Sequence, residues 1–234
     1  MKKILWKQPC LRVGCISTVE GLKFLREKAD KFDMVEVRLD MLKKNGVKFK
    51  RVMRAMETRR NPALLTLRTR WEGGSYSWKS RERILLFEQL MPFADIIDVE
   101  LSNVPLLKSV LDRAVEFRCH VILSAHSIQR KLTSRKIHRL IKEFQTHEAK
   151  IYKIAGLGRT PRDLAILAKT LLEYPQLPLA VMAIGPMANF SRLVLSALGS
   201  RLVYGYLDAP TAKNQPSIRK ISDQLKSLGM KWLS

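Results

Sequence analysis

Residues 34–40 read Met34-Val35-Glu36-Val37-Arg38-Leu39-Asp40, a strict alternation of charged and aliphatic side chains after the first residue. Successive residues of a β-strand point to opposite faces, so the three charged residues would share one face and the aliphatic residues the other. Other stretches repeat the alternation, with polar residues at Thr66, Arg68 and Arg70, at Asp98 and Glu100, and at Ser124 and His126. The pattern predicts several strands that each carry one apolar and one charged face.

Eight short runs rich in β-branched and apolar residues follow one another along the chain. They span residues 13–17, 34–39, 63–68, 96–101, 121–126, 151–155, 179–185 and 202–207. Helical patterns separate them: Leu22, Leu25 and Ala29 lie on one helical face, and 160–163 (Thr-Pro-Arg-Asp) is typical of a helix start. Strand–helix alternation predicts a parallel sheet with the helices outside it.

Eight such units in 234 residues predict an α/β fold with a single (β/α)8 TIM barrel. The barrel domain would cover residues 13–234, and residues 1–12 would form a short N-terminal extension over the barrel floor. The alternative, an open doubly wound sheet, would need a glycine-rich phosphate-binding turn after an early strand. The chain reads Thr-Val-Glu-Gly at 18–21, which does not match that turn.

The charged strand faces indicate where an active site would lie. In an all-parallel barrel both faces of each strand are normally buried. If the aliphatic faces pack against the helices, the charged faces line the interior, where each unpaired charge is costly. These residues should therefore pair with one another or with a ligand. Most lie near the carboxyl ends of their strands, the end that carries the active site in barrel enzymes.

Lys153 lies in the middle of the sixth predicted strand, between apolar neighbours. Burial and nearby cations such as Arg68 would favour its neutral amine, which can attack a carbonyl carbon and form a Schiff base. A structural salt bridge to Glu36, Asp98 or Glu100 explains the same lysine equally well.

His126 ends the strand before that of Lys153, so both side chains could face one ligand. An ordinary imidazole pKa of about 6.5 suits proton transfer at neutral pH. His120, His138 and His147 lack this context, and we expect them on the surface.

Composition narrows the class of protein. Lys and Arg number 43 against 21 Asp and Glu, for a net charge of +22. Such a field attracts anions, either small carboxylates or nucleic acid; a solvated basic surface is the simpler explanation, and we do not expect a nucleic-acid partner. No apolar run approaches the roughly 20 residues of a membrane helix, and the first apolar run is too short for a secretion signal. We therefore predict a cytoplasmic protein with no membrane partner.

The three cysteines, Cys10, Cys15 and Cys119, have neither disulfide nor metal-site spacing, and the histidines have no metal-ligand spacing. We expect buried or idle thiols and no metal.

Several motifs, in order, resemble the type I 3-dehydroquinate dehydratase family over residues from about 13 to 228. They are Glu36-x-Arg38-x-Asp40, Arg68-x-x-x-Glu72-Gly73-Gly74, Ser124-x-His126, Lys153-Ile154-Ala155, Ser191-Arg192 and a late loop ending in Gln215. Each motif alone is weak, whereas the whole series, mostly at strand ends, is specific.

The resemblance implies a reaction. Lys153 would condense with the ketone of 3-dehydroquinate, and His126 would take a proton beside the iminium and return one to the departing hydroxyl. The result is a syn elimination of water to 3-dehydroshikimate, with Glu72 orienting His126. No metal or organic cofactor is implied, and a homodimer is compatible with the family.

The resemblance also implies a set of substrate ligands. Arg192 would bind the carboxylate. The remaining ligands would be Glu36, Arg38 and Arg68 for the hydroxyls, Thr211 and Gln215 on a closing loop, and, as a weaker match, Ser17.

Two stretches depart from the family pattern. His126 is followed by Ser127-Ile128, where the family often has Asp or Asn and then an aromatic residue. The closing loop reads Thr-Ala-Lys-Asn-Gln at 211–215, where Ser/Thr-Ala-Pro-Gly-Gln is usual. Proline restricts backbone freedom and glycine extends it, so we expect their loss to alter how this loop closes.

Three rival functions remain at this stage. One is another lysine Schiff-base barrel such as a class I aldolase, although those enzymes lack this Glu-x-Arg pair with a histidine one strand before the lysine. The others are a basic nucleic-acid-binding protein on a barrel scaffold and a degenerate barrel with little activity.

Overall fold

Eight parallel strands form the centre of the computed structural model, which describes residues 4, 6–28, 31–212 and 214–230. The strands are β1 (Leu11–Ile16), β2 (Met34–Arg38), β3 (Ala63–Thr66), β4 (Ile96–Glu100), β5 (His120–Ser127), β6 (Ile151–Leu157), β7 (Leu179–Ile184) and β8 (Leu202–Tyr206). Their order in the sheet is β7-β6-β5-β4-β3-β2-β1-β8. The predicted (β/α)8 barrel is confirmed.

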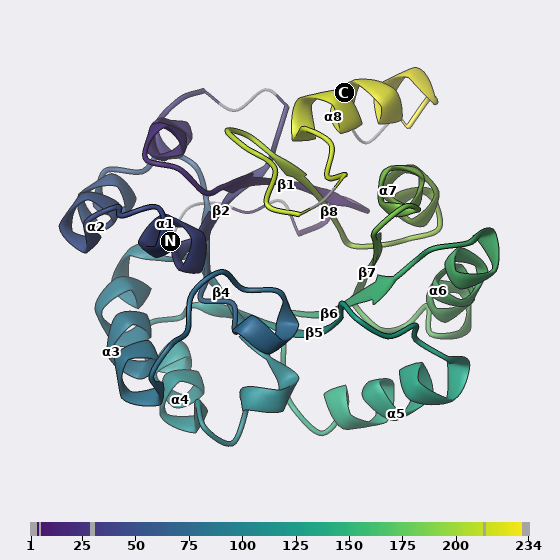
Figure 1. Ribbon diagram of the computed structural model, residues 1–234, viewed down its shortest axis with the longest axis horizontal. Helices are drawn as coiled ribbons and strands as arrows, with labels where there is room; N and C mark the ends of the chain where they lie inside the picture. The colour runs from purple at the N-terminus through teal and green to yellow at the C-terminus, as the bar shows by residue number, and fades with distance from the viewer. Residues whose placement is uncertain (1–3, 5, 29–30, 213, 231–234) are drawn as a thin grey trace.

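The helices lie around the strands as an outer ring (Figure 1). They are α1 (Leu39–Lys44), α2 (Phe49–Glu57), α3 (Ser80–Leu90), α4 (Lys108–Glu116), α5 (Ser134–Phe144), α6 (Pro161–Glu173), α7 (Ala188–Ala197) and α8 (Ile218–Ser227). Short 3-10 helices add η1 (Glu20–Leu25), η2 (Arg70–Glu72), η3 (Met91–Phe93) and η4 (Leu101–Asn103). The predicted start of α6 is confirmed, because the Thr160 hydroxyl accepts from the Asp163 amide at 3.3 Å.

Several predicted boundaries were wrong. β1 begins at Leu11, inside the predicted extension, and β2 ends at Arg38, so Asp40 lies in the first turn of α1 rather than on a strand. The helix expected around Leu22 and Leu25 is the 3-10 helix η1; Ala29 lies outside the described residues. His120 is partly buried, and Trp6 packs edge-on against it with ring centroids 5.1 Å apart; His147 is also partly buried.

The barrel interior has an apolar floor and a polar upper part. At the amino ends of the strands, Leu11, Met34, Leu64 and Ile96 belong to one buried cluster, against which Ile4 and Trp6 of the extension pack. Two residues further along β2, β4 and β6, the inward positions are Glu36, Asp98 and Lys153, all buried. The aliphatic residues of the opposite strand faces pack in a separate cluster with the helices. The charged faces therefore point inward, as predicted.

The seam between β7 and β8 is closed by one backbone hydrogen bond, from the Arg201 amide to the Leu179 carbonyl oxygen (2.8 Å), and by side chains. Among the described residues no backbone ladder joins these two strands. The Ser200 hydroxyl instead accepts from the Val181 amide at 2.9 Å. Arg192 donates to the carbonyl oxygens of Ala183 on β7 (2.7 Å) and Tyr204 on β8 (3.2 Å). These bonds satisfy edge groups that would otherwise be buried without partners.

The outer helices pack against the strands of the barrel. Within the described part of the chain, none of them has both the length and the apolar composition required to cross a bilayer. The three cysteines are buried thiols, and Cys15 is the one that faces the interior.

Candidate active site

A cavity of about 270 Å³ opens at the carboxyl ends of the strands. Nine of the ten predicted site residues line it: Glu36, Arg38, Arg68, Glu72, His126, Lys153, Arg192, Thr211 and Gln215. Ser17 does not. It is buried beside the cavity, where its amide donates to Asp208 Oδ2 at 2.9 Å and its carbonyl oxygen accepts from Asn45. Cys15, one inward position earlier on β1, lines the cavity in its place.

Lys153 lines this cavity, and the residue is only 4 % exposed. Its Nζ lies 3.0 Å from Asp98 Oδ2 and 3.9 Å from Glu36 Oε1. The salt bridge that the sequence left open is therefore present. It occurs at an amine that also faces the cavity, so a structural and a chemical role are compatible.

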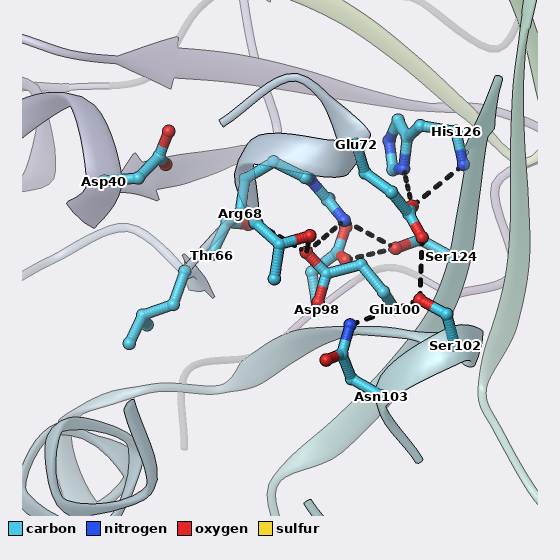
Figure 2. A network of polar contacts seen from close by, with 12 residues as sticks. Asp40, Thr66, Arg68, Glu72, Asp98, Glu100, Ser102, Asn103, Ser124 and His126 are labelled. Carbon is cyan, nitrogen blue, oxygen red and sulfur yellow. Dashed lines mark hydrogen bonds and ion pairs between the residues drawn. The ribbon is translucent and has the colours of Figure 1, made fainter. Parts of the chain in front are cut away.

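Asp98 joins Lys153 to a wider polar network, shown in Figure 2. Its Oδ2 contacts Arg68 Nη2 at 2.8 Å, and its Oδ1 accepts from Ser124 Oγ at 2.6 Å. Burial alone would raise the pKa of Asp98, but Arg68 and Lys153 hold it well below its usual range. Asp98 is therefore a fixed negative charge beside the amine of Lys153.

Arg68 is held by a second carboxylate, Glu100, 3.2 Å from Nη1. Glu100 also accepts from the Thr69 amide at 2.9 Å and pairs with Arg83 of α3, which reaches it from outside the barrel. Sequence reasoning missed Arg83. The available signal was its position, since it shares the buried face of α3 with Phe87 and Leu90.

His126 and Glu72 form a dyad at the cavity wall. Glu72 Oε2 lies 2.9 Å from both the backbone nitrogen and Nδ1 of His126, and Glu72 Oε1 accepts from Ser102 at 3.0 Å (Figure 2). The turn after Glu72 needs glycine: Gly73 has a φ of +89°, and a Cβ on Gly74 would lie 2.1 Å from the Arg68 carbonyl oxygen. An ionised Glu72 accepts from Nδ1–H and leaves Nε2 as the basic nitrogen.

The dyad is electrostatically prepared for proton transfer. Burial, together with the cations Arg68 and Lys153, lowers the pKa of His126 well below its usual value, so the imidazole is neutral at neutral pH. Burial raises the pKa of Glu72 to about 7. A neutral imidazole beside a carboxylate has the arrangement of a general base.

Arg38 and Arg192 are held in different ways. Arg38 makes a bidentate pair with Asp40, with both bonds at 2.9 Å. Arg192 contacts only neutral groups among the described residues: three carbonyl oxygens and the Ser191 hydroxyl. Burial lowers the pKa of Arg192 to about 10, so it stays cationic at neutral pH. A buried guanidinium without a carboxylate partner can receive an anionic ligand.

The late loop is closed on itself by Gln215. Gln215 Oε1 accepts from the Thr211 amide (2.7 Å) and hydroxyl (2.8 Å), and its Nε2 lies 3.7 Å from Cys15 Sγ. Asn214 stands where glycine is usual and has a φ of +61°, a conformation that asparagine tolerates better than most residues. Lys213 lies outside the described residues. At the other departure, Ile128 lines the cavity.

A sequence profile of the type I 3-dehydroquinase family matches residues 10–231. The chain belongs to the type I 3-dehydroquinase family. Among the relatives of this family member is the 3-dehydroquinate dehydratase of Methanothrix thermoacetophila, 29 % identical over 87 % of this chain and 85 % of the relative. That of Archaeoglobus fulgidus is 28 % identical over 93 % and 98 %. The crystal structure of the 3-dehydroquinate dehydratase from Aquifex aeolicus is 26 % identical in sequence. It superposes over 93 % of this chain and 98 % of the Aquifex aeolicus chain, with a TM-score of 0.76.

In this member of the type I 3-dehydroquinase family, three side chains lie at the site although they were not among the site residues predicted from the sequence. They are Asp98 beside the amine, Cys15 beside Gln215, and Tyr204, whose ring lies against Lys153. Asp98 was expected on the charged face of its strand and as one of three possible salt-bridge partners of Lys153, but not as a site residue. The alternation of β8 could have pointed to Tyr204, which lies two residues after the inward-facing Leu202.

Proposed function

We propose that this type I 3-dehydroquinase removes water from 3-dehydroquinate through a Schiff base on Lys153 and releases 3-dehydroshikimate. One observation carries the proposal: a single cavity holds a buried amine, an imidazole oriented by a carboxylate, and a guanidinium with no acidic partner among the described residues. The relatives named above are 3-dehydroquinate dehydratases, which supports the same substrate.

Each residue has one task in the proposed reaction. The amine of Lys153 adds to the ketone carbon and water leaves, giving an iminium that acidifies the neighbouring C–H bond. His126 Nε2 takes that proton and returns one to the departing hydroxyl group, so that a second water leaves. Because one base serves both transfers, proton and hydroxyl leave from the same side. Hydrolysis of the iminium consumes one water and frees the amine.

The charged side chains that line the cavity suggest how the substrate binds. A planar guanidinium can bind a carboxylate through two parallel hydrogen bonds, which assigns the substrate acid to Arg192. Glu36, Arg38 and Arg68 are already ordered by Thr66, Asp40 and Asp98, and they present polar atoms to ring hydroxyls. Thr211 and Gln215 would cover the bound ring.

Reductive trapping tests the proposal. With 3-dehydroquinate and borohydride, the protein should gain a stable mass on the peptide that contains Lys153, and without borohydride it should produce the absorbance of a conjugated enone. A class I aldolase would give an adduct but no enone from this substrate. A folded protein that gives neither signal would overturn the proposal.

Replacing Arg192 with lysine should raise KM for 3-dehydroquinate about 10- to 100-fold, because a hydrogen-bonded charge pair contributes about 1.5–3 kcal/mol. A lysine cannot keep both seam carbonyls and also offer a fork to the carboxylate. Steady-state kinetics at saturating and limiting substrate provide the measurement.

Ser200→Ala is the matched control for Arg192→Lys. Ser200 is buried and bonds across the same seam, but it does not line the cavity. Its loss should lower the unfolding temperature while leaving KM nearly unchanged. If both variants raised KM equally, the effect would come from the seam and not from the carboxylate contact.

The dyad predicts a pH dependence. Protonation removes the negative charge of Glu72 and leaves a weaker acceptor for His126 Nδ1–H, so kcat/KM should fall as pH decreases from about 8 to about 6, following the pKa of about 7 that burial gives Glu72. In Glu72→Gln the decrease of kcat/KM at low pH should no longer occur between pH of about 8 and about 6, and kcat/KM itself should be about 10- to 100-fold lower. An unchanged decrease near neutrality in Glu72→Gln would assign the titration to another group.

The basic surface is proposed to have no part in the reaction. An open groove between η1 and α2 is lined by Lys23, Arg26, Lys48, Lys50, Arg51 and Arg54 and shares no residue with the catalytic cavity. No aromatic side chain lines the groove within the described part of the chain, so it offers no platform for stacked bases. We propose that it is a solvated surface; a homodimer and a cytoplasmic location stay predictions.

A further inference from the structure

The aromatic ring of Tyr204 lies against the reactive amine. Lys153 Nζ is 4.1 Å from the ring centroid, and Tyr204 is 4 % exposed and lines the cavity. A cation within about 6 Å of an aromatic face is attracted by the π electrons, most strongly where water is excluded. We propose that the ring face of Tyr204 stabilises the cationic nitrogen of the iminium on Lys153, an inference that rests on the Schiff-base function proposed above.

The reaction changes which neighbouring groups can stabilise the positive charge on this nitrogen. The ammonium form has three N–H donors for Asp98 at 3.0 Å and Glu36 at 3.9 Å. When the nitrogen adds to the ketone carbon and water departs, it keeps the positive charge but only one hydrogen. At most one strong hydrogen bond to these carboxylates then survives, whereas attraction to the ring needs no N–H.

The fold holds the ring in place before the reaction. Tyr204 sits in the middle of β8 and pairs in register with Val13 of β1. Its carbonyl oxygen accepts from Arg192 Nε at 3.2 Å on the other side. Because β1 on one side and Arg192 of α7 on the other hold the backbone that carries this buried ring, little reorganisation is needed when the charge changes character.

The hydroxyl group of Tyr204 does not carry the effect. It is buried and has no hydrogen-bond partner among the described residues. Burial, with Glu36 and Asp98, raises the pKa of Tyr204 well above its usual value, so the phenol stays neutral. A neutral hydroxyl without a partner offers no base, and its removal deletes an unsatisfied buried group. Phenylalanine should therefore retain the function of this position.

Substitutions at position 204 separate the ring from the hydroxyl. With 3-dehydroquinate and borohydride, Tyr204→Leu should lower both the rate of adduct formation on Lys153 and kcat about 30-fold, and Tyr204→Phe should stay within about threefold of the unaltered enzyme. Tyr206→Leu is the matched control, a tyrosine on the same strand that does not line the cavity. It should trap the substrate normally.

If the leucine variant fails to fold, a series of fluorinated phenylalanines at position 204 tests whether the ring face affects adduct formation on Lys153. Phenylalanines with one, two and three ring fluorines have nearly the same shape but a progressively weaker π face, so trapping should fall step by step. A flat series, or a Tyr204→Phe enzyme as impaired as Tyr204→Leu, would overturn this inference alone. If the unaltered enzyme formed no adduct, the proposed function would be overturned, and this inference with it.

Discussion

Lys153→Met should lower kcat by about 10⁴-fold or more and remove the borohydride adduct entirely, because the reaction then lacks both its nucleophile and its electron sink. Methionine fills nearly the same space without a nitrogen. Asp98 keeps Arg68 at 2.8 Å and Ser124 at 2.6 Å, so the carboxylate is not left without partners and the barrel should still fold. Mass spectrometry and the enone absorbance measure the two effects.

Lys169→Met provides the comparison for Lys153→Met. Lys169 lies on α6 with 64 % of its side chain exposed and pairs with Glu173 on the same helix. The same chemical change there should leave both adduct and turnover intact. If Lys153→Met still formed a substrate adduct, another amine would be the nucleophile, and the assignment of Lys153 would be wrong.

His126→Ala should reduce kcat about 10²- to 10⁴-fold, the usual contribution of a general acid–base group. Unlike Lys153→Met, this variant keeps the amine and should still form the Schiff base, although more slowly, since the imidazole also moves protons in that step. The trapped adduct should add the mass of the substrate less the one water lost in imine formation, plus two hydrogens from the reduction, because elimination is the step that fails.

Adduct mass makes the role of His126 specific. An adduct lighter by one water would mean that elimination proceeds without the imidazole, contrary to its proposed role. His138→Ala serves as the control: His138 lies on the exposed side of α5, where Nδ1 contacts the Tyr174 hydroxyl at 2.6 Å. Its replacement should leave turnover unchanged.

Much of the barrel could be predicted because its signal is local. The two-residue period of a strand is visible in any short stretch, and it placed Glu36, Asp98 and Lys153 on inward faces, where they lie buried. Strand ends were less predictable. Asp40 continues the alternation of β2, but the chain turns into α1 after Arg38 and takes Asp40 with it.

Ser17 shows why a matching residue can miss the cavity. It has the same parity as Cys15, but β1 ends at Ile16 and the chain turns toward η1. Asp208 then fixes the amides of Ser17 and Thr18 at 2.9 and 2.7 Å. This contact joins residues about 190 positions apart, and no local pattern contains it. Ser17 stays a prediction as a substrate ligand.

The partners of Arg83 and Tyr204 were hidden for the same reason. Arg83 meets Glu100, and Tyr204 meets Lys153, only after helices pack on the barrel and β8 aligns beside β1. Sequence spacing predicts which face a side chain occupies, but the register between distant strands decides what it touches. The closing loop is a contrasting case, since Asn214 adopts the left-handed backbone that its residue type favours.

Arg192 donates to backbone carbonyl oxygens of both β7 and β8, which share no ladder in the described residues, and it also lines the cavity. The proposed recognition of a carboxylate and part of the closure of the barrel thus depend on the same side chain. An engineer who wished this scaffold to accept an uncharged molecule could not simply delete the guanidinium. The carbonyl oxygens of β7 and β8 that Arg192 now bonds would first need another hydrogen-bond donor.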